Sequence, residues 1–142
     1  MIEQDYILKM VQEFFEALGK AVGQRGDSDG NDAALQARYD EIYLTFFRRH
    51  PNYFYTLDED DMEEDLEAQC RSERDTFAKA QMLAELLYHD ALLKKDTLQR
   101  CDLLRKSLRL FQYLTHGTKT YSWDREIKMN DIRRLLDEYG SG

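Results

Sequence analysis

The sequence predicts an all-α protein, and three observations support this class. Apolar residues recur at steps of three and four along most of the 142 residues, as they do on helices with one buried stripe. The chain has one proline and seven glycines, so few residues interrupt helices. No segment has the pattern of a strand, since residues 53–55 are too few and follow Pro51. We therefore expect about five to six helices in a single domain over residues 1–142.

The N-terminal part is expected to hold two long helices. The first covers residues 2–22, and the polar connector 23–31, which contains three glycines, ends it. The second helix starts near Asp32. It ends before Pro51, because a proline disfavours the helical conformation in the residue that precedes it.

A short third helix is expected after this proline. Thr56 and Glu59 have the spacing of a capping box, in which each side chain bonds the backbone of the other residue. Acidic residues crowd the first turn, where they complement the helix dipole. Met62 and Leu66 supply a thin apolar edge, so this helix is expected to pack through few side chains.

The clearest supersecondary pattern is a helix hairpin over residues 75–115. Its two helices are separated by only two to four residues, which makes them antiparallel neighbours. Asp96 and Gln99 have the spacing of a capping box at the start of the second helix. Small residues stand where the two helices can approach closely: Ala80, Ala84 and Ala91.

A closing helix is expected over residues 123–139. Ser122 precedes it and is a favourable N-cap. Its apolar side is expected to comprise Trp123, Ile127, Ile132, Leu135, Leu136 and Tyr139. With the closing helix, the hairpin looks like part of a tetratricopeptide-like right-handed array, whose repeated unit is a pair of antiparallel helices.

Three stretches of the chain carry a resemblance to a known family. They are IEQDYILKMVQEFFEALGKAV near the start, AELLYHDALL in the hairpin and TYSWDREIKMNDIRRLL in the closing part. In this order they resemble a family of short bacterial proteins of unknown function with a tetratricopeptide-like helical fold. The resemblance spans nearly the whole chain and implies the fold, but no activity and no catalytic residues.

The charge of the chain is unevenly distributed. The formal net charge is −8, and residues 57–75 account for all of it, with ten acidic and two basic residues. Residues 94–109 hold six basic and two acidic residues. We expect these two segments to pair, either within one chain or across a homodimer. The acidic total argues against a nucleic-acid partner, because phosphate binding depends on Lys and Arg.

The sequence shows no pattern typical of a catalytic, cofactor or metal site. The three histidines are scattered, and no nucleophile motif or glycine-rich phosphate loop is present. Cys70 and Cys101 lack metal-ligand spacing and are expected to be reduced. The N-terminus lacks the pattern of a signal peptide, and no apolar run is long enough to span a membrane. We therefore expect a cytoplasmic protein that is not an enzyme and needs no cofactor.

The leading functional hypothesis is a non-catalytic module for protein–protein interaction, with an unknown protein partner or a homo-oligomer. Its candidate surface is aromatic, because adjacent residues on a helix point about 100° apart and cannot all face the core. The residues of this candidate partner surface are Phe46, Phe47, Tyr53, Phe54 and Tyr55.

The alternative hypothesis is a helical bundle that binds or converts a small molecule. Tyrosine and tryptophan suit pockets that are partly polar. The expected pocket would lie among Tyr43, Phe47, Trp123 and Tyr139.

Overall fold

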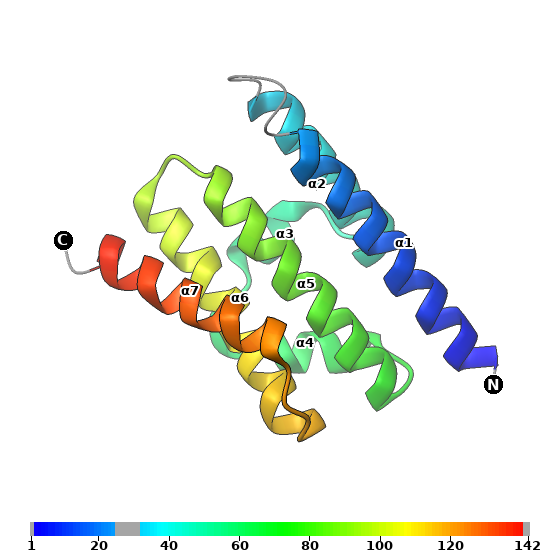
Figure 1. The fold of residues 1–142 in the computed structure, drawn as a ribbon. Helices are drawn as coiled ribbons and strands as arrows, with labels where there is room; N and C mark the ends of the chain where they lie inside the picture. The colour runs from blue at the N-terminus through cyan, green and yellow to red at the C-terminus, as the bar shows by residue number, and fades with distance from the viewer. Residues whose placement is uncertain (1, 25–31, 141–142) are drawn as a thin grey trace. The chain divides into compact units, whose positions relative to one another are not determined.

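A computed structural model describes residues 2–24 and 32–140, and the regular structure in these ranges is entirely helical (Figure 1). The described part contains seven α-helices and one short 3₁₀ helix, which confirms the all-α class. The expected number of about five to six helices is too low, because the short helix Pro51–Thr56 was not predicted. Most of the predicted connector 23–31 lies outside the described residues. Contacts within the chain gather in two compact units, Met1–Leu57 and Asp58–Gly142. The single domain over residues 1–142 stays a prediction.

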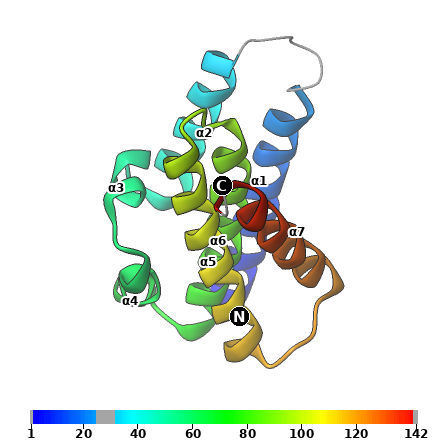
Figure 2. The same ribbon diagram turned by 90° about the vertical axis from the view of Figure 1, so that its left-hand side faces the viewer.

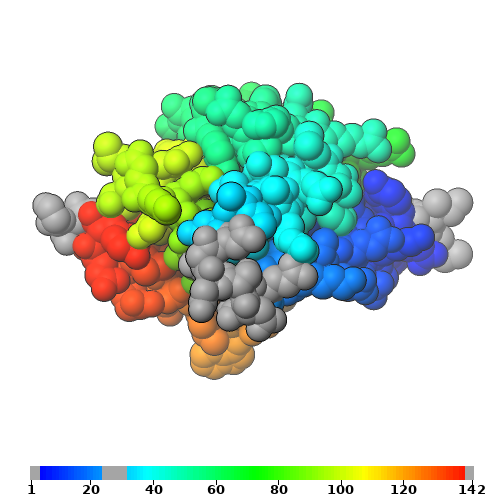
Figure 3. Space-filling model, turned by 90° about the horizontal axis from the view of Figure 1, so that it is seen from above, coloured from blue at the N-terminus to red at the C-terminus, as the bar shows by residue number. Residues whose placement is uncertain are grey.

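The first unit contains α1 (Ile2–Gln24), α2 (Asp32–Phe47) and α3 (Pro51–Thr56). The two long helices lie side by side, as Figure 3 shows in blue and cyan. Their bounds confirm both long helices expected here. The core between them is aromatic: the buried ring of Phe14 meets Phe46 edge to face at 5.3 Å. Aromatic pairs in this geometry add to the stabilisation that burial alone provides.

Helix α3 was not expected from the sequence, because the predicted third helix begins at Thr56, where α3 ends. Pro51 occupies its first turn, where the missing N–H has no intrahelical partner to lose. The His50 Nδ1 atom accepts a hydrogen bond from the Asn52 N–H at 3.2 Å, so this histidine is the N-cap. Arg48 has a φ of 57° and separates α2 from α3. The short helix places Phe54 against Tyr43, with stacked rings 5.8 Å apart.

The second unit contains η1 (Glu59–Asp61), α4 (Met62–Gln69), α5 (Glu73–Leu93), α6 (Thr97–Thr118) and α7 (Trp123–Gly140). Helices α5 and α6 form the expected antiparallel hairpin, and α7 packs against α6 (Figures 1 and 2). The hairpin core consists of fully buried leucines: Leu83, Leu86, Leu87, Leu103, Leu104 and Leu110. Their burial removes apolar surface from water and so stabilises this unit.

Side-chain bonds to the backbone fix the hairpin contact at its middle and at its turn. The buried Ser107 hydroxyl donates to the Ala84 carbonyl at 2.7 Å, which brings the backbones of α5 and α6 close together. At the turn, the Arg100 guanidinium donates to the Lys94 carbonyl through Nε at 3.0 Å. Asp96 accepts a hydrogen bond from the Leu98 N–H, so its predicted role as N-cap is confirmed.

The predicted capping box at Thr56 and Glu59 is wrong. The Thr56 hydroxyl instead donates back to the Asn52 carbonyl at 3.0 Å, because Thr56 is the last residue of α3. The N-cap is Asp58, whose carboxylate accepts from the Asp60 N–H at 2.9 Å and opens the 3₁₀ turn η1. The N-cap therefore lies two residues later than predicted.

Met62 anchors α4 in the second unit, and its removal is the first test of this fold. Met62 and Leu66 are the buried residues of this helix. We expect Met62→Ala to lower the free energy of unfolding by about 2–4 kcal/mol, because it opens a cavity in the core. Glu64→Ala, at an exposed position of the same helix, is expected to change it by less than about 0.5 kcal/mol. Denaturant unfolding measures both; equal effects would contradict the anchoring role.

Candidate interaction site

The exposed face of α7 carries large apolar residues that the sequence analysis assigned to the core. Trp123 is 71% exposed and Ile127 is 60% exposed, so the predicted apolar side is wrong at these two positions. The buried residues of α7 are Met129, Ile132 and Leu135. Each residue turns an α-helix by about 100°, so nine residues place Trp123 on the side opposite Ile132. The helical phase therefore directs Trp123 away from the core.

One row of residues on α7 shares this exposed direction, at steps of four, three, four and three: Trp123, Ile127, Asn130, Arg134 and Asp137. Tyr121, just before the helix, is 64% exposed and meets the Trp123 ring edge to face at 5.6 Å. We call the following five residues the outer face of α7: Tyr121, Trp123, Ile127, Asn130 and Arg134. Exposed tryptophan and tyrosine, together with arginine, are the usual anchors of protein interfaces. This face is thus a stronger docking candidate than scattered exposed apolar residues.

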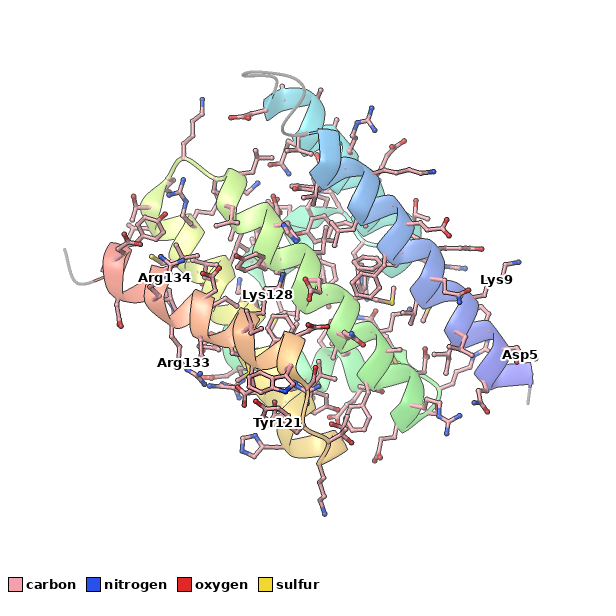
Figure 4. All side chains as sticks on the ribbon, viewed as in Figure 1. Asp5, Lys9, Tyr121, Lys128, Arg133 and Arg134 are labelled. Atoms are coloured by element: carbon pink, nitrogen blue, oxygen red, sulfur yellow. The ribbon has the colours of Figure 1, made fainter. Side chains whose placement is uncertain are left out.

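A shallow groove of about 330 Å³ runs beside the outer face, between α5 and α7. Its lining residues are Tyr88, Ile127, Lys128, Asn130, Asp131 and Arg134. Ile127, Asn130 and Arg134 belong to both the groove and the outer face, so the two form one continuous surface. Figure 4 shows Lys128 on the side of α7 toward α5, and Arg133 on the other side.

Tyr88 and Asp131 join α5 to α7 across this groove. The Tyr88 hydroxyl donates a short hydrogen bond to the Asp131 carboxylate. This bond, and next the Arg134 guanidinium, lower the pKa of Asp131 below its ordinary value. Burial, followed by the bond to Asp131, raises the pKa of the Tyr88 phenol. The phenol is therefore a neutral donor and the carboxylate a charged acceptor across the physiological range.

Lys128 forms a second connection between the two helices. Its ammonium lies 3.3 Å from the Glu85 carboxylate and 4.7 Å from the centre of the Tyr88 ring. Both cations of the groove thus have an acidic neighbour, because Arg134 contacts Asp131. Charged side chains of both signs surround the Tyr88 ring in the groove. This arrangement is typical of the polar rim of an interface, and the exposed apolar residues of α7 lie beside it.

The acidic and basic segments meet within the second unit. Arg109 contacts Asp60 at 2.7 Å and Glu63 at 2.8 Å, and Arg105 lies 3.7 Å from Glu59. These pairs join η1 and α4 to α6, so of the two arrangements expected, the pairing within one chain is present. The hydrogen bond from Arg109 to Glu63 raises the pKa of the arginine.

Of the five aromatic residues proposed as a partner surface, two are buried and three are half-buried. Phe47 and Phe54 are buried in the first unit, so their rings are not available to a partner in this structure. Phe46, Tyr53 and Tyr55 are half-buried. Neighbouring rings of the same unit cover them in part, including Phe14 on Phe46 and Tyr43 on Tyr55. The proposed surface thus contributes at most three partly covered rings.

The four residues of the alternative pocket do not line the groove. Tyr43 and Phe47 are buried in the first unit, whereas Trp123 and Tyr139 belong to the second unit, and none of the four lines the groove. Tyr139 lies under the Arg100 guanidinium at 5.0 Å. Within residues 2–24 and 32–140, no group of three His, Cys, Asp or Glu side chains is arranged to hold a metal ion.

The bond between Tyr88 and Asp131 leads to a prediction about pH. Tyr88→Phe removes the largest cause of the low pKa of Asp131, so we expect this pKa to rise toward its ordinary value. A carboxyl with a lowered folded-state pKa stabilises the fold above its unfolded-state pKa, and this contribution disappears as the pH falls through the folded-state value. The stability difference between wild type and Tyr88→Phe should therefore narrow in acid. Carboxyl NMR titration measures the pKa directly.

Tyr113→Phe is the matched control for this experiment. The Tyr113 hydroxyl donates to Glu67 at 3.3 Å, and burial followed by Glu67 raises the pKa of this phenol to about 12. Its removal takes away a bond from a tyrosine to a carboxylate between α6 and α4 and should leave the pKa of Asp131 unchanged. An Asp131 pKa that is the same in wild type and Tyr88→Phe would show that the hydrogen bond does not set it.

The groove and the outer face of α7 offer groups suited to binding contacts. Aromatic and apolar groups lie beside paired charges, and the described residues of the groove include no histidine, cysteine or serine. In the part of the chain that the structure describes, no helix is long and apolar enough to cross a membrane. No protein-family model, curated protein or solved structure matched the chain in our comparisons.

Proposed function

We propose that the protein is a non-catalytic module for protein–protein interaction and that it binds through the outer face of α7. The exposure of Trp123 and Ile127 on one side of a well-packed helix carries this proposal. Burying such residues in an interface stabilises a complex by removing apolar surface from water. The adjoining groove offers donors and acceptors at the rim, through Lys128, Asn130 and Arg134.

The same proposal includes a tetratricopeptide-like right-handed arrangement for the helices. Two features support it: the antiparallel pair α5 and α6, and the packing of a further helix, α7, against α6. The resemblance to short bacterial proteins of unknown function with this fold agrees with it. Proteins built from such helix pairs commonly present one surface to a partner, and α7 presents an exposed apolar face here.

We further propose that this role needs no cofactor, no nucleic acid and no membrane, and that it is exercised in the cytoplasm. The structure describes Cys70 and Cys101 as free thiols, which fits a reducing compartment. The basic residues Arg105 and Arg109 are engaged by acidic side chains, so they do not form a free phosphate-binding patch.

The double variant Trp123→Ser/Ile127→Ser tests the proposed binding face. Because both side chains are largely exposed, we expect the free energy of unfolding to change by less than about 1 kcal/mol. Binding to protein partners should weaken by at least about tenfold, as truncation of interface anchors does. Quantitative affinity capture from the native cell, with the wild type and the variant compared side by side, measures the loss.

Leu98→Ser is the control for this variant. Leu98 is 80% exposed on α6 and is not part of the outer face of α7. It removes an apolar side chain of similar exposure in the same unit and should leave partner capture unchanged. If the double variant retains every partner of the wild type, binding through the outer face of α7 is refuted.

A further inference from the structure

We propose that the outer face of α7 binds a second copy of this chain, with the two α7 helices antiparallel about a twofold axis. This inference rests on the proposed function, since it names the partner of the same face. An isologous contact of this kind uses one surface twice, so that surface must be complementary to itself. The spacing, the charges and the exposed area of the outer face can each be compared with that requirement.

The spacing of the outer face is symmetric on reversal. Its helical residues follow one another at steps of four, three and four, so an antiparallel copy meets the row in register. Trp123 then lies opposite Arg134 of the second copy, and Ile127 lies opposite Asn130 of that copy. A guanidinium over an indole ring is a favourable cation–π pair. The two Ile127 side chains approach each other near the axis, where they are shielded from water.

The charges beside this row also favour the antiparallel arrangement. At its N-terminal end the charged neighbours are Asp124 and Glu126, since the Arg125 side chain turns away and donates to Thr115 at 3.0 Å. At the C-terminal end they are Arg133 and Arg134, followed by Asp137 and Glu138, and Glu138 lies 3.7 Å from Arg134. An antiparallel copy places Glu126 beside Arg133 of the second copy, whereas a parallel copy would place each of these two residues beside its own equivalent.

Glu126 and Arg133 form the most specific pair of this arrangement. They lie on the same flank of α7, seven residues apart, and an antiparallel copy places each beside the other residue of its partner. Seven residues correspond to about 10.5 Å along a helix, too far for the two side chains to pair within one chain. Within its own chain Arg133 instead donates to the Asn130 side-chain oxygen at 3.1 Å. On the opposite flank, Asp131 is already bonded to Tyr88 and Arg134 of its own chain.

The exposed area indicates a weak dimer. Two aromatic residues and one isoleucine, each 60–71% exposed, offer roughly 350 Å² of apolar surface per chain. The area that two such faces and their flanks would bury is at the lower end of the range for specific interfaces. It is below the roughly 1,600 Å² of a standard interface. Dimers should therefore form at high micromolar concentration, and dilution should dissociate them.

Sedimentation velocity of the purified full chain over a range of concentrations tests the dimer. We expect a concentration-dependent shift from monomer to dimer. The double variant Trp123→Ser/Ile127→Ser should abolish the shift, and Leu98→Ser should preserve it. A wild type that stays monomeric throughout, or a dimer that the double variant leaves intact, would overturn the proposed interface.

Charge reversal tests the antiparallel register with variants that leave the apolar residues in place. Glu126→Arg and Arg133→Glu should each weaken dimerisation by about tenfold, because each creates two like-charge contacts. The double reversal should restore it, and so should an equimolar mixture of the two single variants, whose heterodimer pairs opposite charges at both positions. The differences should shrink at high salt. No rescue in either case refutes the register.

The two proposals fail in different ways. A strictly monomeric protein whose double variant still loses a cellular partner would refute self-association and leave the interaction module standing. A double variant that changes neither the sedimentation of the chain nor its capture of partners would refute both proposals. Dimerisation could respond to Trp123→Ser/Ile127→Ser but not to charge reversal. This result would mean that the second copy binds this face in another orientation, and it would refute the antiparallel arrangement proposed here.

Discussion

The close approach of α5 and α6 is the constraint on which the rest of the second unit depends. It is possible because fully buried alanines and Ser107 leave room for the two backbones, and the Ser107 hydroxyl bonds the Ala84 carbonyl directly. With the turn closed by Arg100, the rotation of α6 about its axis is fixed. α7 then packs on the face that α6 still presents. A helix at the edge of such a hairpin can bury only one side, so the orientation of α7 decides which of its residues face solvent.

The elements that the sequence predicted well are those specified by local signals. Asp96 and Ser122 mark helix starts through their own side chains, and both accept hydrogen bonds from the backbone in the structure. The elements that it missed depend on contacts distant in sequence. α3 has only six residues, too few for periodicity to identify it. Its existence depends on the packing of Phe54 against Phe47 and on His50 as an unexpected N-cap.

The candidate site was missed for a different reason. Residue type placed Trp123 and Ile127 with the core residues of α7, although the helical phase already set Trp123 opposite Ile132. Applying the angle to each residue in turn would have separated the two faces. The groove was beyond such reasoning, because Tyr88 and Asp131 are 43 residues apart and meet only through the packing of α7 beside the hairpin. For the aromatic cluster of the first unit, the error was the reverse: adjacent rings suggested exposure, yet Phe47 and Phe54 fill its core.

Part of the charge asymmetry of the chain is neutralised by ion pairs within it, and this bears on how a partner is selected. Arg109 binds Asp60 and Glu63, so the most acidic and the most basic segments partly neutralise each other. Such exposed pairs contribute little stability, but they reduce the long-range attraction that either segment would exert on an oppositely charged molecule. The outer face of α7 carries one charged residue, Arg134, with Glu126 and Arg133 on its flank. Selectivity at this face therefore depends on register and shape rather than on net charge, and self-complementary spacing is the simplest way for one helix to meet that requirement.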